Sequence, residues 1–212
     1  MPLELWLAYV ATSAVVLAIP GPTILLVLSF SIAHGRKATL PVVAGVALGD
    51  SVAITLSLIG LGTLLAASAF WFTIIKWMGG LYLIYLGIKL VYGAGKPVAL
   101  ESGETPTASP GKLFGNAFIV TALNPKSIVF FIALLPQFIS ASHAPIPQLW
   151  ILGITFVVLA TIGATCYALF AASIRRFLST ARAQKAYGLV GGGLLCAAGA
   201  WALSARRVLA AT

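Results

Sequence analysis

Six long apolar runs dominate the sequence, and each reaches the roughly 20 residues that a helix needs to cross the hydrocarbon core of a membrane. They cover residues 5–33, 40–66, 70–92, 113–139, 149–174 and 186–205. The runs are too long and too evenly apolar for barrel strands, which alternate over about ten residues. The pattern therefore predicts an all-α integral membrane protein with six transmembrane helices.

The composition excludes a soluble globular protein. Of the 212 residues, 60% are hydrophobic and only 8% are charged, whereas a soluble domain carries about a quarter charged residues. The net charge of +9 would suit a nucleic-acid partner only if the basic residues gathered on one surface, but most lie in short gaps between apolar runs. We therefore expect no nucleic-acid partner, and membrane lipids as the surroundings of the chain.

A polar segment divides this single transporter domain into two halves. Residues 93–111 contain three prolines, four glycines and two glutamates, a mixture that predicts a solvent-exposed loop. The first repeat is then 1–92 and the second is 112–207, with three apolar runs each. Because three is an odd number of crossings, the second repeat must run upside down relative to the first.

Each half has an interrupted first run. Pro20, Gly21 and Pro22 interrupt run one, and Asn124 with Pro125 interrupts run four. Pro22 and Pro125 each lie 13 residues from the polar end of their run, at Gly35 and Lys112, which is about 20 Å of helix and hence mid-membrane. A proline removes a backbone donor, so such breaks should face protein or a water-filled cavity, although a simple kink is the alternative. The pattern predicts an inverted repeat with broken helices one and four.

The basic residues predict the orientation in the membrane. Nine of them fall at the connections between runs one and two, three and four, and five and six: Arg36, Lys37, Lys89, Lys96, Lys112, Arg175, Arg176, Arg182 and Lys185. Cytoplasmic loops carry an excess of lysine and arginine. We therefore predict a multi-pass protein of the bacterial inner membrane with these connections in the cytoplasm and both termini outside.

Three charged residues lie well inside the apolar runs, away from the connections, where an unpaired charge costs at least about 2.5 kcal/mol. Asp50 lies near mid-membrane and is suited either to carry a proton or to form a static salt bridge. Lys126 directly follows the second break and is suited to bind a carboxylate or to pair with Asp50. Lys76 lies closer to the outer end of its run and either pairs with Asp50 or reaches the headgroups. Asn124 either orients a substrate group or caps the helix after the break.

These residues form the candidate pathway for substrate and protons: Pro20, Gly21, Pro22, Asp50, Lys76, Asn124, Pro125 and Lys126. Inverted-repeat transporters bind their substrate near mid-membrane, where the halves meet. An enzyme would need buried nucleophile and base pairs or metal ligands, for which the runs offer little, so we expect no catalytic residues, metal or cofactor. An exporter of inorganic or metal ions with the same architecture is the alternative, and it would place acid or histidine clusters at the midplane.

Four motifs together resemble the lysine exporter (LysE/RhtB) family of bacterial amino-acid exporters. They are Pro20-Gly21-Pro22, Gly49-Asp50, the run from Lys76 through Gly79-Gly80 to Tyr85-Leu86-Gly87, and Asn124-Pro125-Lys126. The resemblance covers nearly the whole chain. It implies a six-helix inner-membrane protein that expels amino acids or related compounds in exchange for protons, and it leaves a homodimer open. The second half carries Lys126 and no intramembrane acid, which favours neutral amino acids as substrates.

Overall fold

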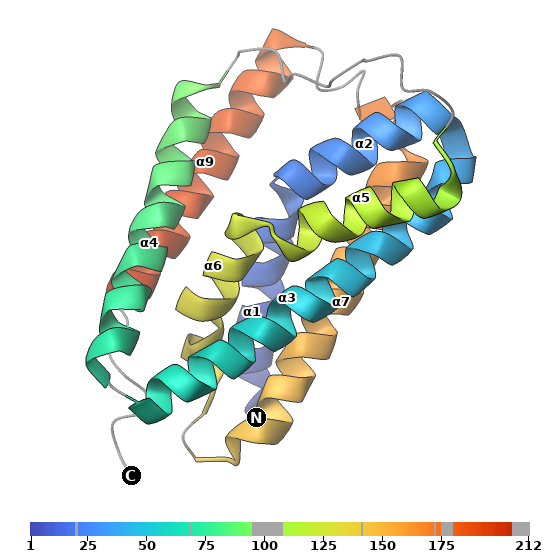
Figure 1. The fold of residues 1–212 in the computed structure, drawn as a ribbon. Coiled ribbons are helices and arrows are strands. Elements are labelled where there is room, and N and C mark those ends of the chain that lie inside the picture. The colour runs from blue at the N-terminus through green and yellow to red at the C-terminus, as the bar shows by residue number, and fades with distance from the viewer. Residues whose placement is uncertain are drawn as a thin grey trace.

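The computed structural model describes residues 1–19, 21–67, 69–94, 108–140, 142–171, 173–174 and 180–204, and this part of the chain contains no strand (Figure 1). The elements are α1 (Leu3–Ala18), α2 (Pro22–His34), η1 (Gly35–Ala38), α3 (Thr39–Ala67), α4 (Ala69–Tyr92), α5 (Pro110–Ala122), α6 (Pro125–Ala133), η2 (Leu135–Phe138), α7 (Pro145–Leu169) and α9 (Ala181–Ser204). The prediction of an all-helical protein is confirmed for the described residues.

Prolines determine where four of these helices begin. Pro22, Pro110, Pro125 and Pro145 are the first residues of α2, α5, α6 and α7. The first amide groups of a helix have no partner within the helix, so a proline there sacrifices no hydrogen bond, and its fixed φ suits the first turn. The same residue that breaks a long apolar run therefore starts the next helix.

Both predicted helix breaks are present. The first apolar run forms two helices, because α1 ends at Ala18 and α2 starts at Pro22. The fourth run forms α5 and α6, which are bent by 41° at Leu123 and Asn124. Pro20 itself lies outside the described residues.

Three predicted boundaries were wrong by a few residues. The connecting loop ends at Ser109 instead of residue 111, because the Ser109 side chain accepts a hydrogen bond from the Lys112 amide and caps α5. The break over residues 140–148 ends at Ala144, because Pro145 and Pro147 lie in the first turn of α7, where prolines are tolerated. Helix α9 begins at Ala181 instead of residue 186.

The helices differ in whether they are long enough to cross a membrane alone. In the described part, three helical stretches are long and apolar enough: Pro22–Gly60, Pro145–Leu169 and Arg182–Ser204. The bent pair α5 and α6 counts as a fourth if it is one span, and Leu3–Ala18 and Trp77–Tyr92 are shorter apolar helices. The described helices therefore agree with a membrane protein, while the arrangement as six spans in an inverted repeat stays a prediction.

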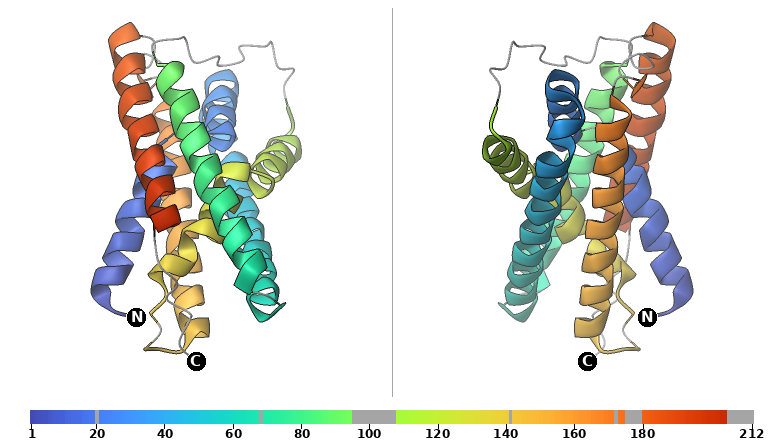
Figure 2. Two further views of the ribbon diagram at one scale, coloured as in Figure 1. Left: turned by 90° about the vertical axis from the view of Figure 1, so that its left-hand side faces the viewer. Right: turned by 90° about the vertical axis from the view of Figure 1, so that its right-hand side faces the viewer.

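Helices α4 and α9 run side by side in opposite directions along one flank of the molecule (Figures 1 and 2). Their close approach depends on glycine. A Cβ atom added to Gly192 would lie 2.5 Å from the carbonyl oxygen of Gly87, and one added to Gly199 would lie 2.6 Å from that of Gly80. Small residues let membrane helices approach closely enough for extensive van der Waals contact.

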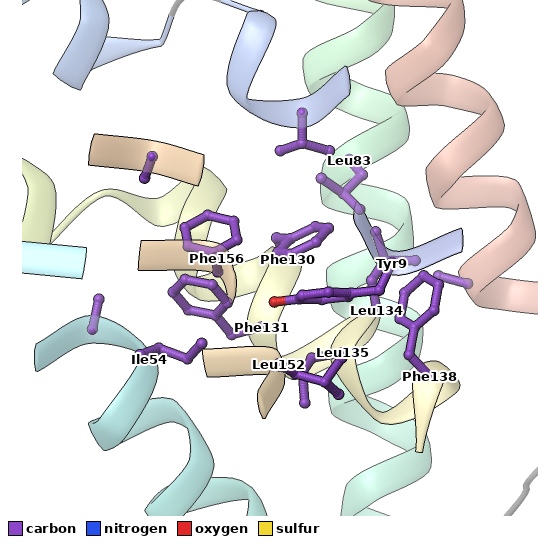
Figure 3. Close-up of a cluster of buried hydrophobic side chains, with 14 of the residues drawn as sticks. Tyr9, Ile54, Leu83, Phe130, Phe131, Leu134, Leu135, Phe138, Leu152 and Phe156 are labelled. Atoms are coloured by element: carbon purple, nitrogen blue, oxygen red, sulfur yellow. The ribbon is translucent and has the colours of Figure 1, made fainter. Parts of the chain in front are cut away.

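Two larger clusters of buried side chains lie at different levels of the bundle. The first contains aromatic residues of α1, α6, η2 and α7, and Figure 3 shows Phe130 next to Phe156 and Tyr9 next to Phe138. The second joins α2, α3, α5 and α7 through smaller residues such as Val27, Val42 and Ala117. Both clusters include residues of α7, which therefore extends along the whole core.

The glycine contacts predict a position-specific loss of stability. Gly192→Ala should lower the free energy of unfolding by about 1–3 kcal/mol, because the added methyl group meets backbone atoms that cannot rotate away. The neighbouring Gly193 has no atom within 4 Å of an added Cβ, so Gly193→Ala should be neutral or stabilising. Thermal unfolding in detergent measures both variants, and equal stability of the two would contradict the close approach.

Candidate functional site

The two helix breaks meet inside the bundle, and a buried asparagine connects them. The Asn124 side-chain amide donates to the Thr23 hydroxyl in the first turn of α2, over 3.1 Å. Its carbonyl oxygen accepts from the Lys126 backbone amide, also over 3.1 Å, which caps α6. Asn124 is 3% exposed. The Asn124 side chain therefore accepts a hydrogen bond from a backbone amide at the start of α6. It also links α6 to the start of α2, which belongs to the other half of the chain.

Lys126 reaches across to the end of α1. Its ammonium donates to the carbonyl oxygens of Val16, over 3.0 Å, and Ile19, over 2.7 Å. Tyr167 of α7 donates its hydroxyl to the third nearby carbonyl, that of Ala18, over 2.8 Å. The last carbonyls of a helix lack partners and carry its partial negative charge. Lys126 thus offsets the partial negative charge at the end of α1 and donates hydrogen bonds to carbonyl groups that lipid could not pair.

A small polar cavity lies where these elements converge. Its volume is about 20 Å³, which is room for about one water molecule. The residues around it come from α1, α2, α3, α6 and α7, with Gly21 and Asn124 at the two breaks: Leu17, Gly21, Thr23, Ile24, Val46, Asp50, Asn124, Lys126, Ser127 and Ala160. The starts of α2 and α6, each with partial positive charge, both border this space.

Asp50 and Lys126 are the charged residues of the cavity, and both are buried, with exposures of 3% and 7%. Among the residues that the structure describes, none forms a hydrogen bond or an ion pair with the Asp50 carboxylate. The site therefore holds a buried acid and a buried base in one cavity without direct contact.

Helix α3 carries Asp50 into the core because small residues flank it. Gly45 and Gly49 pack against α5, where an added Cβ would lie 2.5 Å from the Phe114 carbonyl oxygen and 2.7 Å from the Thr121 side chain. Here they bring α3 against α5 of the same chain.

Apolar clusters border the cavity. Its lining residue Ala160 belongs to the aromatic cluster, Val46 belongs to the cluster of smaller residues, and Ile24 belongs to a third buried cluster with Leu28. A site for a small molecule usually measures several hundred Å³. In the described conformation the cavity is therefore too small for an amino acid.

The structure brings most of the predicted site residues together. Gly21, Asp50, Asn124 and Lys126 line the cavity, and an added Cβ at Gly21 would lie 3.4 Å from the Lys126 ammonium nitrogen. Pro22 and Pro125 start the two helices that meet there. Lys76 lies in α4, but its side chain is outside the described part of the structure, as is Pro20.

Sequence reasoning missed three residues of the site: Thr23, Ser127 and Tyr167. Threonine and serine are common in membrane helices and give no signal by themselves. Tyr167 lies 149 residues from its partner Ala18, a separation that only the fold resolves. The described residues include no group of three histidine, cysteine, aspartate or glutamate side chains that could hold a metal ion.

The family model of the LysE type translocators matches residues 14–205, which is nearly the whole chain. The chain belongs to this family. The resemblance drawn from the Pro20, Asp50, Lys76 and Asn124 motifs is confirmed at the level of the family. Members of the LysE family are membrane proteins, in agreement with the apolar helices of the structure.

Curated relatives extend over the same length as this LysE-type chain. A homoserine/homoserine lactone efflux protein of Salmonella typhimurium is 38% identical over 206 residues, 97% of this chain and 99% of the relative. An uncharacterized membrane protein of Vibrio cholerae is 34% identical, over 93% and 98%. A leucine efflux protein of Salmonella choleraesuis is 32% identical, over 79% and 77%. No solved structure matches the chain.

The cap at the second break predicts a graded loss of stability. Asn124→Ala should cost about 1 kcal/mol, because α6 loses its cap and the buried Thr23 hydroxyl loses its donor. Asn124→Ser keeps an oxygen able to cap the helix and should recover part of this loss. Thermal unfolding in detergent tests the order, and an alanine variant as stable as the serine variant would contradict the capping role.

Proposed function

We propose that this protein is an inner-membrane efflux transporter for amino acids or amino-acid derivatives, binding its substrate in the cavity between the two broken helices. One observation carries the proposal: a buried acid, Asp50, and a buried base, Lys126, line the same cavity at the point where the two breaks meet. An amino acid carries the complementary pair of charges. The efflux proteins of Salmonella support this substrate class by their names.

We propose six spans in two inverted halves, with both termini outside. The positions of the helix ends support this topology, because η1, the end of α4 and the start of α9 lie towards one end of the molecule, and the N terminus and the start of α7 lie towards the other (Figures 1 and 2). Arg36, Lys37, Lys89, Arg182 and Lys185 belong to the first group of elements. Their charge makes that end the cytoplasmic one.

In this proposal, Lys126 and the helix starts bind the substrate carboxylate. The ammonium uses two of its three N–H donors on the end of α1, which leaves one for a ligand. The starts of α2 and α6 add partial positive charge. Asp50, which has no hydrogen bond to the described residues, binds the substrate ammonium.

In this proposal, the Asp50 carboxylate also couples the export of substrate to the entry of protons. Asp50 is either neutralised by a proton or paired with the ammonium of the substrate, so the two compete for one site. A transporter that changes its orientation only when Asp50 is neutralised by one of them moves protons and substrate in opposite directions. Each direction requires one apolar cluster to separate: the aromatic cluster towards the outside, and the cluster around Val42 and Ala117 towards the cytoplasm.

Efflux of preloaded labelled homoserine and leucine from cells tests the function. Cells expressing the protein should lose label several-fold faster than cells with the empty vector, and a panel of other amino acids defines the range. Loss of label at the vector rate for every amino acid, together with export of an inorganic ion, would overturn the proposal in favour of ion transport.

The role of Asp50 is tested in inside-out vesicles with an acidic lumen, in which export appears as uptake. Asp50→Asn should reduce gradient-driven accumulation at least tenfold, because an amide neither binds a proton nor pairs with an ammonium group. Glu4→Gln removes a carboxylate from the exposed start of α1 and should leave accumulation unchanged. Persistent gradient-driven accumulation by the Asp50→Asn variant would contradict the role of Asp50 in coupling.

The role of Lys126 is tested by concentration dependence in the same vesicles. Lys126→Gln should raise the KM for the amino acid about tenfold or more, since the loss of a charged hydrogen-bond partner costs about 1.5–3 kcal/mol. Lys112→Gln removes an exposed lysine at the start of α5 and serves as the matched control. An unchanged KM in the Lys126→Gln variant would show that the lysine only stabilises the end of α1.

A further inference from the structure

A second, larger hollow lies between α3 and α7. It measures about 360 Å³, a volume typical of small-molecule sites. We call it the α3–α7 groove, and its walls include Ser51, Ile54 and Leu58 of α3 and Trp150, Gly153 and Val157 of α7. Trp150 is 68% exposed, so the groove opens at the surface of the bundle.

The groove continues the line of the central cavity. Asp50, Ile54 and Leu58 are spaced four residues apart and therefore lie on one face of α3. Asp50 lines the cavity, whereas Ile54 and Leu58 line the groove. On α7, Ala160 lines the cavity and Val157, one turn away, lines the groove. The two spaces are thus successive sections of the contact between the same two helices.

Ile54 is a buried side chain at this contact. It is 4% exposed, and its terminal methyl group lies 3.7 Å from the position of a Cβ added at Gly153. One helical turn, about 5.4 Å, separates Ile54 from Asp50 along α3. A substrate held by its charged groups at Asp50 would therefore direct its side chain towards Ile54 and the groove.

The groove offers few polar partners to such a side chain. Its hydroxyl protons are already used within α3: Ser51 donates to the Ala47 carbonyl and Thr55 donates to the Ser51 carbonyl, both over 2.7 Å. Apart from the indole N–H of Trp150, the remaining lining side chains are apolar. A polar or charged side chain entering here would lose its hydration with little compensation, whereas an aliphatic chain would gain apolar contact.

We propose that the α3–α7 groove is the subsite for the side chain of the substrate, and that it selects neutral amino acids with an aliphatic side chain. This inference rests on the proposed function. Binding of the charged groups at Asp50 and Lys126 is common to all amino acids, so discrimination falls to the groove. Its occupant is the substrate side chain, in place of a lipid acyl chain or a second copy of this protein.

Filling the groove tests this specificity. Gly153→Leu places a larger side chain in the groove. The position tolerates a side chain, because an added Cβ would lie at ordinary van der Waals distance, 3.7 Å, from Ile54. We expect efflux of labelled leucine to fall about tenfold, because the aliphatic side chain loses its apolar contacts. Homoserine has a shorter, polar side chain that gains little from the apolar groove, so its efflux depends mainly on Asp50 and Lys126. It should stay within about twofold of the wild-type rate, which also reports that the variant is folded.

Gly163→Leu is the matched control, since it lies on the same helix, has open space around it and is not part of the groove. It should leave the efflux of both substrates unchanged. In the opposite direction, Val157→Ala enlarges the groove and should raise phenylalanine efflux relative to leucine. Both effects together would support the subsite.

Three outcomes would overturn it. If Gly153→Leu lowers the efflux of both substrates equally, the position acts on the transport cycle and not on specificity. If it lowers neither, a lipid chain or a second copy fills the groove. If the wild-type protein exports homoserine and no aliphatic amino acid, the groove is not a side-chain subsite, although the proposed function stands. Export of no amino acid at all would instead remove the proposed function itself.

Discussion

A helix that ends inside a membrane leaves carbonyl and amide groups that lipid cannot satisfy. This chain has two such breaks, and side chains from the second half of the sequence form hydrogen bonds with the helix ends of the first half. The ammonium of Lys126 holds the last carbonyls of α1, and Asn124 connects the start of α6 with the start of α2. The arrangement of the elements around the cavity depends on these few hydrogen bonds.

The two breaks also produce the chemistry of the site. A continuous helix would present only side chains at mid-membrane, whereas a break presents backbone ends with their partial charges. Two helix starts, a lysine and an aspartate then share about 20 Å³ of space. Because Asp50 and Lys126 are buried beside apolar clusters, their interactions with the proposed ligand would be stronger than in water.

Helices α3 and α7 have a different task from the broken ones. Both are uninterrupted over 29 and 25 residues, and their contact contains the cavity and, further along, the α3–α7 groove. The broken helices supply Lys126 and two helix starts, and α3 supplies Asp50 and, one turn further, an apolar wall. In the proposed function, the charged groups would bind the part that all amino acids share, and the apolar wall would select the side chain.

The sequence by itself determined the membrane environment, the all-helical fold, the two breaks and the family. These follow from local rules: the length of apolar runs, the missing amide of proline and the order of short motifs. It also singled out Asp50, Asn124 and Lys126, because a polar group in an apolar run is costly unless it has a partner or a function. Helix starts such as Pro145 were misplaced by a few residues, since a proline is equally suited to a loop and to a first helical turn.

Only the tertiary structure decided which partners these residues have. The sequence left Lys126 free to bind a carboxylate or to pair with Asp50, and the fold brought its ammonium to the carbonyls of Val16 and Ile19, 110 and 107 residues away. Thr23 and Tyr167 joined the site in the same way. A hydrogen bond requires a distance near 3 Å and a direction, and neither is encoded in spacing along the chain when the partners lie on different helices.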